Sequence, residues 1–477
     1  MRRPLVLTAA FYLAPMLPGF APAATAQGSG SQESKPIPSL AEKTQGMDKE
    51  DGFIPLYWDS KSGKIWLEIS RFESEFLYYV SLPAGMGQNN VGLNRGDLGP
   101  SMVVYFQRVG PRVLMMEPNY GYRAISDDAL ERKSVDDGFP QSVIWGFEVG
   151  AETGETVLVD ATDFFIRDAH GVVNTLRRAQ QGTFRLDTSR SAVYHPRTRG
   201  FPKNTEVELT LTFTSDQPGR FVQSVTPTGS ALTLRQHHSF VELPTDPFPM
   251  RKADPRAGFN GISFMDYATP LGEPLQKQYI ARHRIQKKDP TAAMSEAIEP
   301  IVYYLDPGTP EPIRSALLEG ASWWNEAFEA AGFIDGFQVE VLPPDADPMD
   351  ARYNMIQWVH RSTRGWSYGN SIVDPRTGEI LKGHVTLGSL RVRQDWLIGE
   401  GLTSPYAEGD EHPSEVREMA LARIRQLGAH EVGHTIGLSH NYISSAQTAA
   451  GKYSVMDYPH PMIELDQSGN VELRDAY

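Results

Sequence analysis

The stretch GAHEVGHTIGLSHNY, residues 428–442, places three imidazoles and a carboxylate close together. His430 and His434 are four residues apart, so on a helix they project from one face, about 6 Å apart along the axis. Zinc binds imidazole nitrogens at about 2.0–2.1 Å in tetrahedral geometry, and one helical turn suits that spacing. Gly437 can take the left-handed backbone that ends a helix, so that His440 approaches from another direction. The pattern predicts one Zn2+ ion held by three histidines, with an open position typical of catalytic sites.

Glu431 directly follows the first predicted ligand. We expect it to act as the general base, taking a proton from the attacking water and delivering it to the leaving amine. The zinc ion would acidify that water and polarise the scissile carbonyl. The residues therefore favour a zinc-dependent endopeptidase whose partner is a peptide or protein substrate. Two alternatives remain open: an envelope binding or scaffold protein with a structural or inactive zinc site, and a zinc hydrolase for non-peptide amides.

The motif HEVGHTIGLSH resembles the zinc motif of the metzincin metalloproteases, and SVMDYP follows it. The resemblance implies that Met456 packs beneath the imidazoles without binding zinc. It also implies that Tyr458 reaches the zinc or the oxyanion, whereas a buried tyrosine with a structural hydrogen bond is the alternative. The stretches GASWWNEAFEAAGF, RYNMIQWV and DPRTGEILKGHVTLG are similar to a large bacterial family of zinc-dependent proteases. Members carry β-rich modules of unknown function before the catalytic domain and continue past the methionine turn, so we expect this catalytic domain to be incomplete at its C-terminus.

The elements that must position these residues are helices on a mixed sheet. HPSEVREMALARIRQLGAHEVGHTIGLSH predicts a long helix that starts at Pro413 or Ser414 and carries the histidines. A second helix is expected from Thr309 to Gly332. Residues 371–388 predict a hairpin. Its second strand, ILKGHVTLG, lies either at an exposed edge above the zinc, where a peptide could add as a further strand, or inside the sheet.

The chain before this region predicts an exported, β-rich protein. Residues 1–26 have the basic start, apolar run and Ala-Thr-Ala ending of a signal peptide; a membrane anchor is the alternative, but Pro15 and Pro18 interrupt the apolar run. We expect a flexible linker at 27–50, a β-rich module at 51–245, an extended connection at 246–289 and a metzincin-like catalytic domain at 290–477. The predicted fold is therefore multi-domain and α+β.

Composition narrows the possible partners and the compartment. The 477 residues include no cysteine, which excludes disulfides and a cysteine nucleophile, and the formal net charge is −14. A chain this acidic has no general field for nucleic acid. We expect a periplasmic or secreted protein without membrane insertion of the mature chain, and the sequence leaves the oligomeric state open.

Overall fold

A computed structural model describes residues 36–348, 350–404, 414–446, 454–465, 467 and 471–473. The predicted signal peptide lies outside these residues, as does the C-terminal tetrapeptide. Every element described below belongs to the unit that begins at Pro38. None of the described helices is long and apolar enough to cross a membrane.

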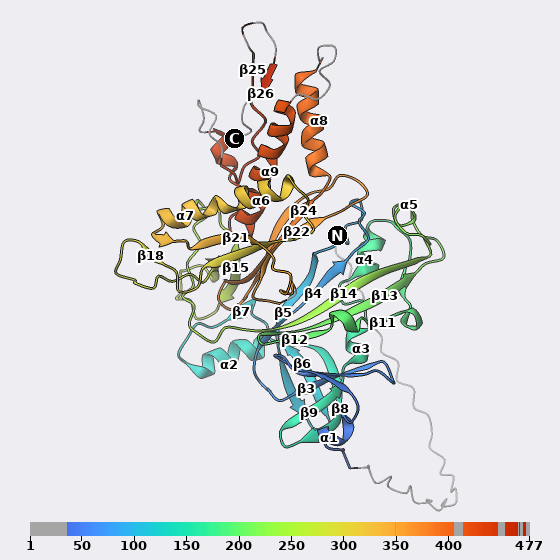
Figure 1. Cartoon of the computed structure of the whole chain (residues 1–477). Coiled ribbons are helices and arrows are strands. Elements are labelled where there is room, and N and C mark those ends of the chain that lie inside the picture. The colour runs from blue at the N-terminus through green and yellow to red at the C-terminus, as the bar shows by residue number, and fades with distance from the viewer. Residues whose placement is uncertain are drawn as a thin grey trace, which may run out of the picture. The chain divides into compact units, whose positions relative to one another are not determined.

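An extended antiparallel sheet dominates the N-terminal part of the described chain (Figure 1). Its strand order is β1-β2-β3-β9-β8-β6-β5-β4-β14-β13-β10, and β11 and β12 also pair with β13. The predicted β-rich character of this part is confirmed. The strands are β1 (Asp48–Glu50), β2 (Leu56–Asp59), β3 (Lys64–Ile69), β4 (Phe76–Ala84), β5 (Asp97–Val109), β6 (Arg112–Glu117), β8 (Ser142–Thr153), β9 (Thr156–Asp160), β10 (Arg185–Leu186), β11 (Ala192–Val193), β12 (Arg199–Phe201), β13 (Asn204–Thr214) and β14 (Ala231–Glu242).

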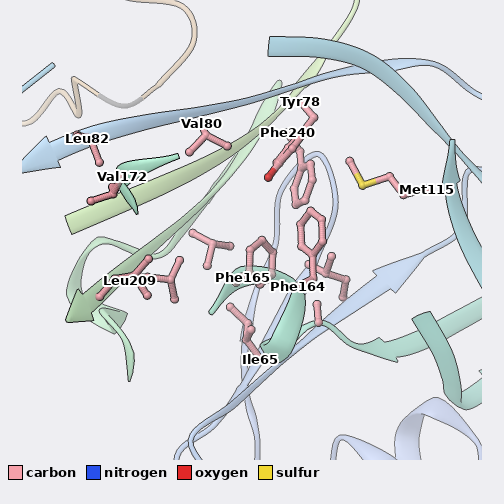
Figure 2. Close-up of a cluster of buried hydrophobic side chains, with 14 of the residues drawn as sticks. Ile65, Tyr78, Val80, Leu82, Met115, Phe164, Phe165, Val172, Leu209 and Phe240 are labelled. Carbon is pink, nitrogen blue, oxygen red and sulfur yellow. The ribbon is translucent and has the colours of Figure 1, made fainter. Parts of the chain in front are cut away.

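One hydrophobic core holds this sheet together. Strands from both halves of the strand order contribute to it, so the sheet curves around a shared interior. Phe164 and Phe165 of the short helix α3 (Thr162–Phe165) insert among the strand side chains, next to Tyr78 and Phe240 (Figure 2). Burying aromatic rings of this size is a large hydrophobic contribution. The other helices of this part are α1 (Leu40–Lys43), α2 (Ala129–Gly138), α4 (Val172–Arg178) and α5 (Arg220–Gln223), with short 3-10 turns η1 (Thr188–Arg190) and η2 (His195–Arg197).

Two segments differ from the sequence prediction. Residues 40–50 were expected to be flexible, but they contain α1 and β1, and β1 pairs with β2. Residues 246–289 were expected to be an extended connection, but they contain β15 (Gly261–Asp266), β16 (Gln276–Ile280) and β17 (Arg282–His283). β15 pairs with β16 and with β7 (Tyr122–Arg123), while β17 joins the second large sheet. The connection is therefore built into both parts of the fold.

The C-terminal part is a mixed sheet covered by helices. The strand order is β17-β24-β22-β19-β21, parallel throughout, and β23 pairs with β24 in the antiparallel direction. The predicted hairpin is present as β23 and β24. The elements of the C-terminal part are β19 (Ile301–Leu305), β21 (Phe337–Val341), β22 (Asn354–Val359), β23 (Tyr368–Val373), β24 (Glu379–Gly388), α6 (Ile313–Ser322), α7 (Trp324–Ala330), α8 (Arg391–Thr403), α9 (Ser414–Thr435), η3 (Tyr442–Ala446) and the short strands β18 (Ser295–Glu296), β20 (Phe333–Ile334), β25 (Ile463–Leu465) and β26 (Val471–Leu473).

The helix α9 is the element that positions the candidate site. It spans Ser414–Thr435 and packs on α6, α8, β23 and β24; Pro413, one of the two predicted starts, lies outside the described residues. α6 can approach α9 closely because a side chain at Gly320 would collide with the backbone of Arg425. The helix predicted from Thr309 to Gly332 is instead divided into α6 and α7. The Ser322 hydroxyl donates to the Leu318 carbonyl at 2.7 Å, a contact that bends helices near this break.

Candidate metal centre

The three predicted ligands lie together at the C-terminal end of α9. One ring nitrogen from each of His430, His434 and His440 lies within 4.8 Å of the other two. The Nε2 atoms of His434 and His440 are 3.1 Å apart. Two ligands 2.0–2.1 Å from a zinc ion in tetrahedral geometry are about 3.3 Å apart, so the His434–His440 pair has the spacing that a small divalent ion requires. Among the described residues, this is the group of three or more potential ligands that could hold a metal.

Hydrogen bonds fix the direction of each ring. Nδ1 of His430 lies 2.6 Å from the Val455 carbonyl, and Nδ1 of His434 lies 2.8 Å from the Leu438 carbonyl. Because a carbonyl only accepts, both Nδ1 atoms must carry the proton, which leaves Nε2 as a free lone pair. Burial lowers the pKa of His430 to about 4, and burial also lowers the pKa of His440, so both rings stay neutral at pH 7. Neutral, oriented imidazoles are what metal binding requires.

The turn after α9 delivers the third histidine. Gly437 has φ +106°, the left-handed region predicted from the sequence, and a side chain there would collide with the Ala281 carbonyl. The amide of Leu438 donates to the Gly433 carbonyl at 3.0 Å, which closes the helix end. The chain can therefore reverse at this point and return His440 toward His434.

A segment of the connection is hydrogen-bonded to this turn, and no sequence pattern predicts that contact. The amide of Ser439 donates to the Gly258 carbonyl at 2.9 Å, and the amide of Asn260 donates to the Gly437 carbonyl at 2.8 Å. The Asn260 side chain adds a bond to the Leu438 carbonyl at 3.3 Å. We refer to residues 258–260 as the strap. Since Leu438 also holds His434, the strap supports the backbone around two predicted ligands.

Met456 lies beneath the helix that carries the histidines. It is 3% exposed, and its side chain packs against Gly433, between the two helical histidines in sequence. The preceding residue, Val455, supplies the carbonyl that holds His430. The Met456 carbonyl accepts from the amide of Asn441, next to the third histidine. The methionine turn thus packs against α9 at Gly433, and its backbone bonds His430 and the residue after His440.

Glu431 is buried beside the ring cluster. It is 5% exposed, and this burial raises the pKa of its carboxyl to about 8, although a hydrogen bond from the Gly369 backbone and the charge of Arg391 oppose the shift. Gly369 of β23 crosses α9 so closely that a side chain there would collide with the Glu431 carbonyl. The carboxyl is therefore held in place, and it can gain or lose a proton near neutral pH.

Two tyrosines contact the third histidine. The Tyr458 hydroxyl is 2.9 Å from Nε2 of His440, and the Tyr442 hydroxyl is 3.0 Å from Nδ1. Tyr458 is 58% exposed, so the alternative of a buried structural tyrosine does not describe it. Tyr442 was not predicted as a site residue. Its position two residues after His440 was the one sequence signal that could have indicated it. Its hydroxyl can accept from Nδ1–H, which would leave Nε2 of His440 free like the other two.

A cleft of about 810 Å³ opens onto these residues. Tyr368 and Gly369 of β23 form one side of it, together with Glu431 and the three histidines. Within the described residues, β23 pairs only with β24, so β23 is the edge strand near the site. β24 (the ILKGHVTLG strand) lies inside the sheet, between β22 and β23, so the interior alternative holds for it.

The far wall of the cleft contains charged residues that the sequence analysis missed. Arg391 of α8 and Arg423 of α9 line the cleft, and both donate to the fully buried Asp395. The helix α8 itself was not predicted, since RVRQDWLIGEGLT has two glycines and no clear apolar stripe. Arg423 could have been noticed, because it precedes His430 by seven residues and so shares its helix face.

Comparison with known families supports the resemblance over the site. Residues 96–288 match a domain of unknown function (DUF5117), a range that includes the strap. No curated protein and no solved structure matches the chain. Residues 412–477 match the family model described as Met-zincin, and this range holds the three histidines, Glu431 and Met456.

Proposed function

We propose that this chain is a zinc-dependent metalloendopeptidase that cleaves peptide bonds in the cleft beside α9. The observation that carries the proposal is the convergence of three imidazoles, two of them oriented by backbone carbonyls, next to one buried carboxyl. The metal ligands of the proposed enzyme would be His430, His434 and His440. The Met-zincin match over residues 412–477 supports the same conclusion independently of the geometry.

The residues fit zinc better than a hard oxygen-preferring cation. Three imidazole nitrogens suit Zn2+, whereas calcium and magnesium favour carboxylate and carbonyl oxygens. A zinc ion bound here would supply a Lewis acid that polarises the scissile carbonyl and acidifies a water molecule. The carbonyls of Val455 and Leu438 hold the two helical ligands in the tautomer that can bind it.

Glu431 would move the protons of the reaction. With its pKa raised by burial to about 8 in the metal-free protein, its carboxyl can hold and release a proton near neutral pH. In the proposed cycle its carboxylate accepts a proton from the attacking water and then gives that proton to the nitrogen of the leaving amine. The amide of Gly369 orients the carboxyl for both transfers.

An extended peptide would lie along β23. Tyr368 and Gly369 of this edge strand line the cleft, and backbone hydrogen bonds to an edge strand hold a substrate in extended form without demanding particular side chains. The Tyr458 hydroxyl, 2.9 Å from His440 Nε2, would donate a hydrogen bond to the oxyanion that forms at the attacked carbonyl. Gly433 and Met456 act only by supporting the rings.

We also propose that the protein works outside the cytoplasm on peptide or protein substrates. The predicted signal peptide at 1–26 supports export, and the negative net charge of −14 argues against nucleic acid as a partner. The oligomeric state stays open.

The test compares the wild-type chain with Glu431→Gln, which keeps the shape of the side chain and removes its base. We expect both proteins to bind one equivalent of zinc, and only the wild type to digest a peptide library. Glu326→Gln, on the exposed side of α7, serves as the matched control and should retain activity. A Glu431→Gln variant as active as wild type would refute the assigned role. Zinc binding with no hydrolysis of any peptide by the wild type would favour a scaffold with a structural metal.

A further inference from the structure

The lining of the cleft carries more positive than negative side-chain charge. Arg364, Arg391 and Arg423 line the cleft, whereas Glu431 is the carboxylate found among its described lining residues. A proteolytic cleft that binds the backbone alone has no need of these charges. These arginines therefore indicate that the cleft also recognises a negatively charged group.

The pairing around Asp395 leaves this charge unbalanced. Nε of Arg391 donates to one carboxylate oxygen at 2.9 Å, and Nε of Arg423 donates to the other at 2.8 Å. Asp395 is fully buried, so one carboxylate serves two guanidinium groups. Nη1 of Arg423 donates to the Pro459 carbonyl at 3.2 Å. In the described part of the chain, neither terminal nitrogen of Arg391 has a protein acceptor, and its side chain is 23% exposed.

The position of these groups suits a side chain near the scissile bond. Arg423 and His430 lie on one face of α9, two turns apart, which corresponds to roughly 10 Å along the helix. Gln426 and Leu427 line the cleft between them. Arg391 lines the same cleft as Glu431 and His430. The guanidinium groups thus lie in the cleft that holds the histidines, and Arg423 is about two helical turns from His430.

We propose that the Arg391–Asp395–Arg423 cluster is a subsite that binds a carboxylate of the peptide substrate. Asp395 holds the two guanidinium groups at fixed orientation, and the free terminal nitrogens of Arg391 offer the paired donors that match a carboxylate. The inference rests on the proposed peptidase function and adds a substrate class to it. The carboxylate comes either from a Glu or Asp side chain beside the cleaved bond or from the C-terminus of the peptide.

The experiment measures kcat/KM of the full chain for matched quenched peptides. One set differs by Glu or Gln at each position around the cleaved bond, and a second set differs by a free or amidated C-terminus. We expect the wild type to prefer the carboxylate in one set by about 10- to 100-fold, as expected for a charge-assisted hydrogen bond in a partly enclosed site. The set that shows the preference identifies the source of the carboxylate.

Variants at Arg391 test the assignment without breaking the buried Asp395–Arg423 pair. Arg391→Gln should reduce the preference to within about threefold of unity, and Arg391→Glu should reverse it in favour of a Lys-containing peptide. Arg393→Gln, on the exposed side of the same helix, is the matched control and should keep the wild-type ratio. Thermal unfolding of each variant reports whether it folds.

The outcome separates this inference from the proposed function. Cleavage with equal rates for every matched pair would overturn the carboxylate subsite and leave the peptidase intact. If no peptide is cleaved, fluorescence anisotropy of the same labelled pairs still decides the question. Tighter binding of the carboxylate peptide, lost in Arg391→Gln, would support the subsite, and equal binding would overturn it.

Discussion

Gly433 allows the methionine turn to reach the helix that carries the histidines. An added Cβ would lie 2.7 Å from Cζ2 of Trp324 and 3.1 Å from Cε of Met456, and closer still to the Met456 sulfur. Gly433→Ala gains about 1 kcal/mol of helix propensity. Overpacking a filled site costs about 1–3 kcal/mol, and here both neighbours are constrained, because Trp324 also donates to the Ala429 carbonyl at 2.8 Å. Subtracting the gain of about 1 kcal/mol leaves a net loss of up to about 2 kcal/mol in the free energy of unfolding.

Gly428, in the same helix, provides the matched control. Its added Cβ would lie 3.3 Å from Cδ2 of Leu317 and at ordinary contact distances of 3.5 and 3.6 Å from backbone atoms of Leu317 and Ala321, so Gly428→Ala should be neutral or stabilising by up to about 1 kcal/mol. The two variants should differ by about 2 kcal/mol in urea unfolding of the metal-free proteins. Gly433→Ala should also weaken zinc binding by about 10- to 100-fold, since a displaced Met456 moves the Val455 carbonyl that orients His430.

A double mutant tests the assigned cause. Met456→Ala alone should cost about 2–5 kcal/mol through the cavity it leaves. If the collision between the two side chains is the reason for the loss, the Gly433→Ala/Met456→Ala protein should lose at least about 1 kcal/mol less than the sum of the single variants. The reasoning is refuted if Gly433→Ala matches Gly428→Ala in both stability and zinc affinity.

Three further predictions follow from the same structure. Asn260→Pro removes the backbone amide that donates to the Gly437 carbonyl, so zinc binding, measured by competition with a chelator, should be about 10-fold weaker. Asn260→Ala keeps this amide and should lose less zinc affinity. Equal zinc affinities of the two variants and the wild type would exclude a role for the strap. Tyr458→Phe should bind zinc normally but show a kcat at least about 10-fold lower, and an unchanged kcat would remove Tyr458 from catalysis. Burial lowers the pKa of Lys382 from 10.5 to about 8, so between these pH values the unfolded chain binds more protons than the folded one, and stability should rise with pH. From pH 8 to 9.5, wild type should gain up to about 2 kcal/mol relative to Lys382→Met in urea unfolding; no gain would contradict the shift.

The histidine cluster was predictable because its geometry is encoded locally. The i, i+4 histidines, the glycine that ends the helix and the third histidine occupy eleven consecutive positions, and α9 fixes their geometry with little help from the distant chain. The β-rich character of the N-terminal part was also predictable, because β3, β4, β13 and β14 have clear apolar and β-branched patterns.

The remaining features depend on contacts between distant segments. No local pattern indicates that Gly258 and Asn260 bond the metal turn nearly 180 residues later, and nothing in RVRQDWLIGEGLT shows that Arg391 will share Asp395 with Arg423. Which strand of the hairpin lies at the sheet edge was undecided in the sequence for the same reason. Pairing between β22 and β24 settles it, and that pairing joins segments separated by a connection with no distinctive signal.

X-ray absorption spectroscopy at the zinc edge, combined with metal analysis of the purified chain, tests the central claim most directly. We predict one zinc per chain, bound by three imidazole nitrogens at about 2.0–2.1 Å, with one of the three lost in His440→Ala. A folded protein without stoichiometric metal, or a zinc shell unchanged in His440→Ala, would contradict the account.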